Sequence, residues 1–325
     1  MPLWRKLSTG QKTRTCSQSW QNAAMDLERP RLEGSLAVRG GRRLTFAEYG
    51  APRGEPIIWM HGTPGGRRQV PIEARNYALE HDLRIIGLDR PGIGSSTPHL
   101  YDNILDWTGD LEIVAERLSI ATMRLVGLSG GGPYTLAAAA AMPDRVHGVG
   151  VLGGVPPTQG DDAVKGGLVG FSGLFAPMLT HGYVPLGLGL GKVIQLLRPL
   201  AGAAIGAYAA VQPQGDKELL NHPEFKAMFL DDLVGGSRKQ AIAPLADLVL
   251  FARHWGFELG DVDVPVRWWH GDEDPIVPLS HGQQAAEKLP QAEFIVNAGH
   301  SHLGGLGISV EVLSTLMELG PTAPA

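Results

Sequence analysis

The nine residues from 124 to 132, Arg-Leu-Val-Gly-Leu-Ser-Gly-Gly-Gly, place Ser129 in a G-x-S-x-G pattern. The apolar start of this run is typical of a buried strand, and the alanine-rich stretch from Pro133 to Met142 favours a helix. A serine on so sharp a strand-to-helix turn has strained backbone angles, and side chains two positions before and after it would collide. Gly127 and Gly131 occupy those two positions. We therefore expect the turn to hold the Ser129 hydroxyl above the end of a strand.

The G-x-S-x-G pattern alone is weak evidence for such a turn, because a chain with 44 glycines in 325 residues can contain it by chance. The sequence on either side of the pattern must therefore support the assignment. From about Gly34 onward, strand-like and helix-like stretches alternate, which is typical of the α/β class with a mostly parallel sheet flanked by helices. The first two strands form a hairpin around Gly40-Gly41. We predict eight strands: Leu36 to Val38, Arg43 to Tyr49, Ile57 to Met60, Arg84 to Leu88, Arg124 to Leu128, Val146 to Val151, Val264 to Trp269 and Glu293 to Val296.

Helices are expected between these strands and after the last one. The alternation breaks between about Pro156 and Gly260, where the sequence is helical and rich in glycine and shows no clear strand. We interpret residues 156–260 as a helical cap inserted over the carboxyl ends of the strands, and residues 34–155 and 261–325 as the α/β core. The predicted core helices are Ala74 to Glu80, Ile104 to Leu118, Pro133 to Met142, His281 to Lys288 and Val310 to Glu318.

Composition excludes several classes of partner and site. The net charge of −5, from 28 basic and 33 acidic residues, gives no general attraction to nucleic acid. A single cysteine, Cys16, excludes an internal disulfide framework and a cysteine-based metal site. Residues 1–25 are basic and rich in hydroxyl groups but lack the apolar centre of a secretory signal. We expect a disordered extension over residues 1–33 and a cytoplasmic protein, with an organelle transit peptide as the alternative.

Residues 166–191 contain no Asp, Glu, Lys or Arg, yet they include eight glycines and two prolines. Their apolar stretches are short and interrupted, which is unfavourable for a membrane span. We expect a lid that folds over the protein's own substrate pocket and makes no membrane contact. A lid that touches a membrane is the alternative.

A serine hydroxyl is a weak nucleophile at neutral pH, so Ser129 needs a nearby base, and that base needs an acid to orient it. The predicted strand ending at Trp269 is followed by His-Gly-Asp-Glu-Asp-Pro-Ile-Val-Pro, residues 270–278. The last strand is followed by Asn-Ala-Gly-His-Ser-His, residues 297–302. Both loops lie at the sheet edge where Ser129 is expected, and the order along the chain is Ser, Asp, His.

With these motifs, residues 34 to 320 resemble the α/β-hydrolase superfamily, whose fold joins an eight-stranded sheet to an inserted cap. The resemblance rests on the elbow around Ser129, the G-x-x-D-x-x-V-P loop and the Gly-His loop in that order. It implies that Asp274 is the orienting acid, with Asp272 as the fallback. It also implies that the base directly follows the loop glycine, which makes it His300, with His302 as the fallback.

The loop His-Gly-Thr-Pro-Gly-Gly, residues 61–66, resembles the oxyanion loop of the same family. By this resemblance the backbone N–H groups of Thr63 and Gly130 stabilise the negative charge of a tetrahedral intermediate, while His61 braces the loop. The turn Asp-Arg-Pro-Gly-Ile-Gly-Ser-Ser, residues 89–96, is interpreted as part of the scaffold. No H-E-x-x-H, paired Cys, Walker or EF-hand pattern is present, so we predict no metal and no other cofactor.

A serine at the elbow disfavours alkyl displacement, for which haloalkane dehalogenases and epoxide hydrolases of this superfamily use a carboxylate. The remaining chemistry is acyl transfer, and the charge-poor cap favours a small or lipophilic ester, as in a carboxylesterase or lipase. One alternative is an aminopeptidase resembling proline iminopeptidase, with Asp231, Asp232 and Glu224 as cap carboxylates for a substrate amine. The loop sequence His-Gly-Thr-Pro-Gly departs from the His-Gly-Gly-Pro-Gly pattern of those enzymes. A non-catalytic ligand-binding protein on the same fold is an alternative of another class.

Overall fold

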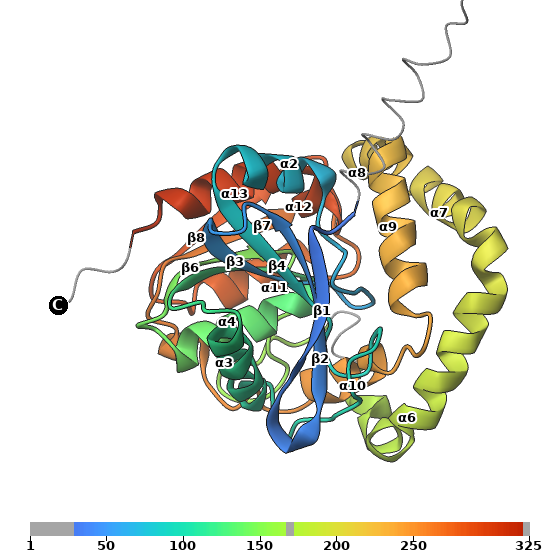
Figure 1. Ribbon diagram of the computed structural model, residues 1–325, viewed down its shortest axis with the longest axis horizontal. Coiled ribbons are helices and arrows are strands. Elements are labelled where there is room, and N and C mark those ends of the chain that lie inside the picture. Colours follow the sequence, from blue (N-terminus) through green and yellow to red (C-terminus); the bar gives the residue numbers. More distant parts are fainter. Residues whose placement is uncertain (1–28, 167–171, 321–325) are drawn as a thin grey trace, which may run out of the picture.

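The computed structural model describes residues 29–166 and 172–320, and Figure 1 shows their arrangement around one sheet. The two pairings β1–β2 and β2–β4 are antiparallel, and all the others are parallel. The predicted eight-stranded, mostly parallel sheet is thereby confirmed. Across the sheet the strands follow the order β1 (Leu32–Ala37), β2 (Arg43–Gly50), β4 (Leu83–Leu88), β3 (Glu55–Met60), β5 (Met123–Leu128), β6 (Val146–Leu152), β7 (Val266–Gly271) and β8 (Ala292–Asn297).

Helices cover both faces of the sheet, so the central strands are apolar on both sides. Ile58 and Leu125 point into one core cluster, which also holds side chains of α3 (Thr108–Arg117), α4 (Gly132–Ala141) and α11 (Leu279–Ala286). Their neighbours Ile57 and Val126 point into the other cluster, with α2 (Ile72–Glu80) and α13 (Ser309–Glu318). This two-sided burial explains why these strands are continuous apolar runs in the sequence.

The segment between β6 and β7 is helical, as the sequence predicts, and Figure 1 shows its helices along one side of the sheet. In chain order they are α6 (Ser172–Leu197), the short 3-10 helix η4 (Arg198–Leu200), α7 (Ala201–Ala210), α8 (Gln214–Asn221), α9 (Pro223–Gly236) and α10 (Ala243–Phe251). At the other end of the chain, β1 begins at Leu32, four residues before the predicted start. Of the predicted disordered extension over residues 1–33, residues 1–28 lie outside the described residues, while Leu32 and Glu33 belong to β1.

The charge-poor stretch, for which the sequence predicts a lid over the substrate pocket, is largely exposed. Leu190 at the end of that stretch lines an apolar cavity, but Leu174, Met178 and Leu186 are exposed on α6. One continuous helical stretch, Gly173–Ala210, is long and apolar enough to cross a bilayer by length and composition alone. Part of the predicted lid, residues 167–171, lies outside the described residues.

Candidate active site

Ser129 lies at the turn between β5 and α4, and its backbone φ is 51°, in the left-handed region that serine seldom adopts. The two flanking glycines are needed because the chain folds tightly against itself here. A Cβ on Gly127 would lie 2.7 Å from the carbonyl oxygen of Gly131, and a Cβ on Gly131 would overlap the carbonyl oxygen of Met60. The turn therefore holds Ser129 in a strained conformation that larger neighbours would exclude.

A continuous chain of hydrogen bonds joins Ser129 to His302 and Asp274. The distance from His302 Nε2 to Ser129 Oγ is 2.7 Å, and that from His302 Nδ1 to Asp274 Oδ2 is also 2.7 Å. All three side chains are buried. This geometry allows the imidazole to take the serine proton while the carboxylate holds the opposite ring nitrogen.

The carboxylate of Asp274 is stabilised in its ionised form. Burial alone would raise its pKa, but the hydrogen bond and charge of His302 and the backbone N–H groups of Val277 and Ile276 outweigh burial and lower the pKa below the ordinary value. Asp274 is thus a hydrogen-bond acceptor at neutral pH, as an orienting acid must be.

The prediction of His300 as the base is corrected by this geometry, which gives the position to the fallback His302. The loop turns at Gly299, where φ is 73°, and directs the His300 ring toward α8. A Cβ on Gly215 of α8 would lie 2.6 Å from the His300 ring, and His300 Nδ1 lies 3.0 Å from the carbonyl oxygen of Ala298. The chain needs two further residues to return to the sheet edge, so the second histidine meets Ser129.

The fallback acid Asp272 and the loop histidine His270 have other partners. Asp272, the fallback acid, accepts a hydrogen bond from the N–H of Gly299 at 2.7 Å and so braces that turn. His270 is buried beside Asp274, with its Nε2 2.8 Å from the carbonyl oxygen of Val277. Burial lowers the pKa of His270, which favours the neutral ring.

Asp216 on α8 fixes the loop that carries His302, a role that the sequence analysis missed. Its buried carboxylate accepts hydrogen bonds from the N–H and hydroxyl of Ser301 at 2.9 and 2.6 Å, and from the N–H of Leu303 at 3.2 Å. The cap thus holds the residues on both sides of His302. A single aspartate on a polar helix gives no sequence signal for such a contact.

The predicted oxyanion donors come from two loops that the structure brings together. A Cβ on Gly130 would overlap the hydroxyl of Thr63, so the two residues are in contact. Arg90 holds the loop that carries Thr63, because its guanidinium donates to the carbonyl oxygens of His61 and Gly62 at 2.5 and 2.9 Å. The turn at residues 89–96, interpreted as scaffold, therefore positions the predicted oxyanion loop at residues 61–66.

His61 braces this loop. Its Nε2 accepts a hydrogen bond from the backbone N–H of Arg90 at 3.3 Å, and its Nδ1 lies 2.7 Å from the carbonyl oxygen of Gly62. Burial and the neighbouring Arg90 charge hold the pKa of His61 well below its ordinary value. The ring is therefore neutral, and its contacts are those of a structural residue.

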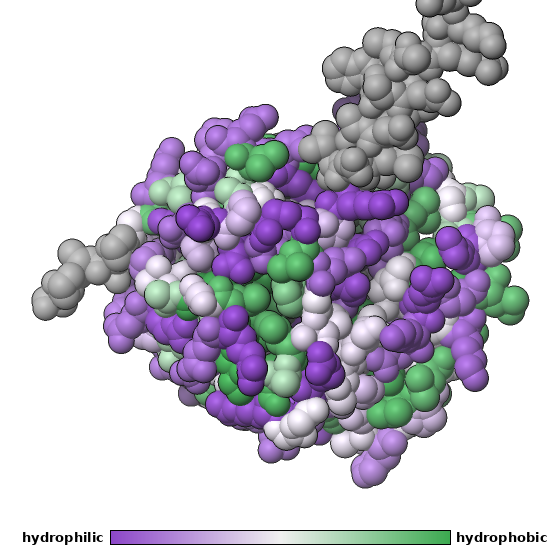
Figure 2. All heavy atoms as spheres, viewed as in Figure 1, coloured by the Kyte–Doolittle hydropathy of each residue, from purple (hydrophilic) through white to green (hydrophobic). Residues whose placement is uncertain are grey.

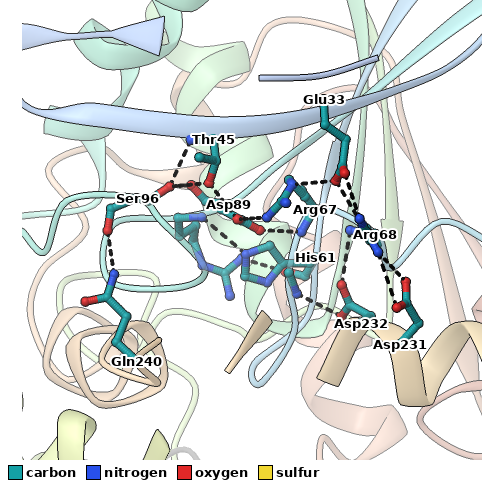
Figure 3. A network of polar contacts seen from close by, with 12 residues as sticks. Glu33, Thr45, His61, Arg67, Arg68, Asp89, Ser96, Asp231, Asp232 and Gln240 are labelled. Carbon is teal, nitrogen blue, oxygen red and sulfur yellow. Dashed lines mark hydrogen bonds and ion pairs between the residues drawn. The ribbon is translucent and has the colours of Figure 1, made fainter. Parts of the chain in front are cut away.

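The cap is tied to the next part of the same loop by the polar network in Figure 3. The buried carboxylate of Asp232 on α9 accepts hydrogen bonds from the N–H groups of Gly66 and Arg68 at 2.8 and 3.1 Å. The carboxylate of Asp89 accepts hydrogen bonds from the backbone N–H and from the guanidinium of Arg67, each at 2.6 Å. Burial, with the nearby charge of Asp89, raises the pKa of Asp232 to about 7.

The carboxylates considered for binding a substrate amine are thus engaged elsewhere. Asp232 holds the loop, and Asp231 pairs with the guanidinium of Arg68 at 2.9 Å. Glu224 is exposed at the start of α9, where its ligand atom lies within 4.8 Å of those of Glu73 and His222. That surface cluster has the atom types of a metal site, but it shares no residue with the triad.

Beside the oxyanion loop lies an apolar cavity of about 230 Å³. Pro64 and Gly65 of the loop form one wall, while Leu190 and Ile194 of α6 and Leu233 of α9 form another. The charge-poor cap therefore meets the oxyanion loop with aliphatic side chains.

Comparison with known proteins agrees with the geometry. A family model described as alpha/beta hydrolase fold matches residues 55–181. The chain is 25% identical to a probable proline iminopeptidase of Leptolyngbya boryana over 295 residues, 84% of this chain and 89% of that protein. It is 36% identical to a proline iminopeptidase of Arabidopsis thaliana over 129 residues, and this match spans only 33% of that protein and 39% of this chain.

Solved structures share the fold at low sequence identity. The esterase RhEst1 of Rhodococcus sp. superposes with a TM-score of 0.64 and 22% identity, covering 89% of this chain and 99% of that one. An esterase of Exiguobacterium antarcticum superposes with a TM-score of 0.64 and 17% identity, covering 88% of this chain and 100% of that one. Together with the sheet order, the serine elbow and the family match, these similarities lead to one assignment. The chain has the fold of the α/β-hydrolase superfamily, and its residues 55–181 match the family model of that fold.

Proposed function

We propose that this chain is a serine hydrolase that cleaves carboxylic esters of small or lipophilic acyl substrates. The observation that carries the proposal is the hydrogen-bonded chain from Ser129 through His302 to Asp274. A serine with a buried histidine at 2.7 Å, itself held by an ionised carboxylate, is equipped for nucleophilic attack on a carbonyl carbon.

In the first half of the proposed reaction, Ser129 Oγ attacks the ester carbonyl and its proton passes to His302 Nε2. Asp274 stabilises the imidazolium through Nδ1, and the N–H groups of Thr63 and Gly130 stabilise the oxyanion. The C–O bond to the leaving alcohol then breaks, and His302 returns the proton to that oxygen. An acyl group remains on Ser129.

Water completes the cycle. His302 takes a proton from the water as its oxygen attacks the acyl carbon, and the resulting tetrahedral intermediate collapses to release the acid and to reprotonate Ser129. Every proton transfer uses His302, and no step requires a metal or another cofactor. His300 has no part in this sequence because its ring packs against Gly215.

The cavity next to Pro64 and Gly65 supports the proposed acyl group. Its walls are aliphatic, and its volume of about 230 Å³ suits a short or medium apolar group rather than a charged one. This supports an ester with a lipophilic acyl or alcohol part.

A proline-iminopeptidase-like aminopeptidase is the second candidate, and the names of the relatives favour it. Such an enzyme needs a carboxylate near the serine to bind the substrate amine. Asp231 and Asp232 are bound to the loop at residues 66–68, which favours the ester substrate for this chain.

Turnover of p-nitrophenyl esters of increasing chain length, compared with turnover of prolyl-arylamides, tests this proposal. We expect hydrolysis of the short and medium esters and negligible cleavage of the amides. Amide cleavage without ester cleavage would reverse the order of the two candidates.

A further inference from the structure

The outer side of the cap carries an unusual concentration of exposed aliphatic side chains. Leu196 and Val211 are each 79% exposed, and Leu174 is 75% exposed. Figure 1 places α6 and α7 at the rim of the molecule, and Figure 2 shows several hydrophobic patches among hydrophilic residues along this rim. We call this surface the apolar cap face and define it by Leu174, Met178, Leu186, Leu196, Leu200 and Val211.

This face is too apolar for a surface that stays in water. Within the stretch Gly173–Ala210 the most apolar window is only 11% buried by the rest of the protein. Soluble monomers seldom leave so many large aliphatic side chains in contact with water, because burial of each one would stabilise the protein. A partner that buries it is therefore expected.

Charge distinguishes between the possible partners. Residues 163–215 contain no Asp or Glu, but they include Lys165, Lys192 and Arg198. A second copy of the chain, joined face to face by a two-fold axis, would bring these cations together with no acid in the segment to pair them. An anionic lipid surface would attract the cations and also bury the aliphatic groups.

A cavity with an excess of basic residues beside this face strengthens the lipid assignment. It has a volume of about 600 Å³, and its acids Asp89 and Asp231 are paired with Arg67 and Arg68 of the same lining. The buried Asp232 also lines it, as do Arg198 of η4 and Arg238 and Lys239 after α9. Within the described part of the chain, the side chains of these three residues make no hydrogen bond or ion pair. Arg198 lies between the exposed Leu197 and Leu200, so the cavity and the apolar cap face are adjacent.

The helices lie along the surface and do not form one straight span. The 3-10 helix Arg198–Leu200 separates α6 from α7. Leu179 of α6 and Ile205 and Ala209 of α7 are buried against the rest of the protein. One side of each helix thus packs against the protein, while side chains on the rest of its surface are exposed.

We propose that the apolar cap face docks on anionic lipid bilayers, with Arg198, Arg238 and Lys239 receiving lipid phosphate groups. The inference replaces the expectation that the cap makes no membrane contact. It does not depend on the ester chemistry, because docking is measured without turnover. The opposite side of α6 lines the cavity beside Pro64, so a docked cap would place that cavity near the lipid surface.

The test is vesicle flotation of the full chain. The probes are vesicles of phosphatidylcholine alone and of equal parts phosphatidylcholine and phosphatidylglycerol. We expect binding to the mixed vesicles that weakens with added salt, and weaker binding to phosphatidylcholine. The double variant L196S/L200S should bind the mixed vesicles at least about tenfold more weakly than the natural chain. Leu79→Ser on α2, where Leu79 is 57% exposed, is the matched control and should bind like the natural chain.

Three results would overturn the proposal. One is the absence of binding to mixed vesicles by the natural chain. A second is equal binding by L196S/L200S and by the natural chain. The third is a concentration-dependent dimer in light scattering that L196S/L200S abolishes, because a second copy would then cover this face. Serine labelling by a fluorophosphonate checks that each variant is folded.

Discussion

The hydroxyl of Thr63 donates a hydrogen bond of 2.6 Å to Asp247, a buried carboxylate on the last helix of the cap. The same carboxylate accepts from Arg90 at 2.8 Å and from the Tyr134 hydroxyl at 2.7 Å. Asp247 therefore joins the oxyanion loop, the scaffold turn and the helix after Ser129. Through this residue a helix of the segment between β6 and β7 contributes to the geometry of the site.

Replacement of Asp247 by alanine should strongly destabilise the protein. It leaves the Arg90 guanidinium, whose side chain is 1% exposed, without its charge partner. A buried ion pair that loses one member costs about 3–5 kcal/mol. Urea unfolding measures the loss. The control is Asp231→Ala, which breaks an exposed pair with Arg68 and should cost about 1 kcal/mol or less. Equal losses for the two variants would refute the role of Asp247.

Position 131 requires glycine because the backbone of Met60 leaves no room for a side chain there. The variant Gly131→Ala should lower the free energy of unfolding by about 2 kcal/mol or more, because the new Cβ would overlap the carbonyl oxygen of Met60. Gly189→Ala in α6 is the control, since a Cβ there has no neighbour within 4 Å. It should be neutral or stabilising by about 1 kcal/mol. Thermal unfolding of both variants provides the comparison, and a stable Gly131→Ala protein would contradict this account of the elbow.

Asp232 makes the stability depend on pH. Its pKa is about 7 in the folded protein and near the ordinary 3.8 in the unfolded chain. Between these values the folded state holds a proton that the unfolded state has released, so the free energy of unfolding falls as pH rises through this window and levels off above it. The full effect is about 4 kcal/mol at most, at about 1.4 kcal/mol for each pKa unit.

The variant Asp232→Asn isolates this effect, because an amide does not titrate. The stability of Asp232→Asn relative to the natural chain should increase as pH rises from about 4 to 7. Asp231→Asn, at the exposed neighbouring position, should not show this trend. Melting temperatures across the pH range decide the matter, and a constant difference between Asp232→Asn and the natural chain would exclude Asp232 as the titrating group.

Local patterns predict the core of this protein well because the strands are buried on both faces. The β5 run and the two glycines beside Ser129 define the elbow without reference to distant residues. The choice between His300 and His302 is different, because it depends on how Gly299 turns the loop and on the packing of His300 against Gly215. Asp216 and Asp247 act through cap helices far away in sequence, and no local pattern predicts which loops they reach.

The exposure of the cap helices also escapes sequence reasoning. A glycine-rich and charge-free stretch has the same composition whether it lines a pocket or faces a lipid surface. The structure separates the two sides of α6: Ile194 lines the cavity, while Leu196 is 79% exposed. Only the arrangement of the helix against the rest of the cap distinguishes them.

The most direct test of the account is the rate of covalent labelling by a fluorophosphonate in the natural chain and in Ser129→Ala, His302→Ala and His300→Ala. The account predicts rapid labelling of the natural chain, none in Ser129→Ala, a rate lower by a factor on the order of 10³ or more in His302→Ala, and a nearly unchanged rate in His300→Ala. Slow labelling of His300→Ala together with rapid labelling of His302→Ala would contradict the assignment of His302 as the base, and a natural chain that does not react would point to a non-catalytic protein.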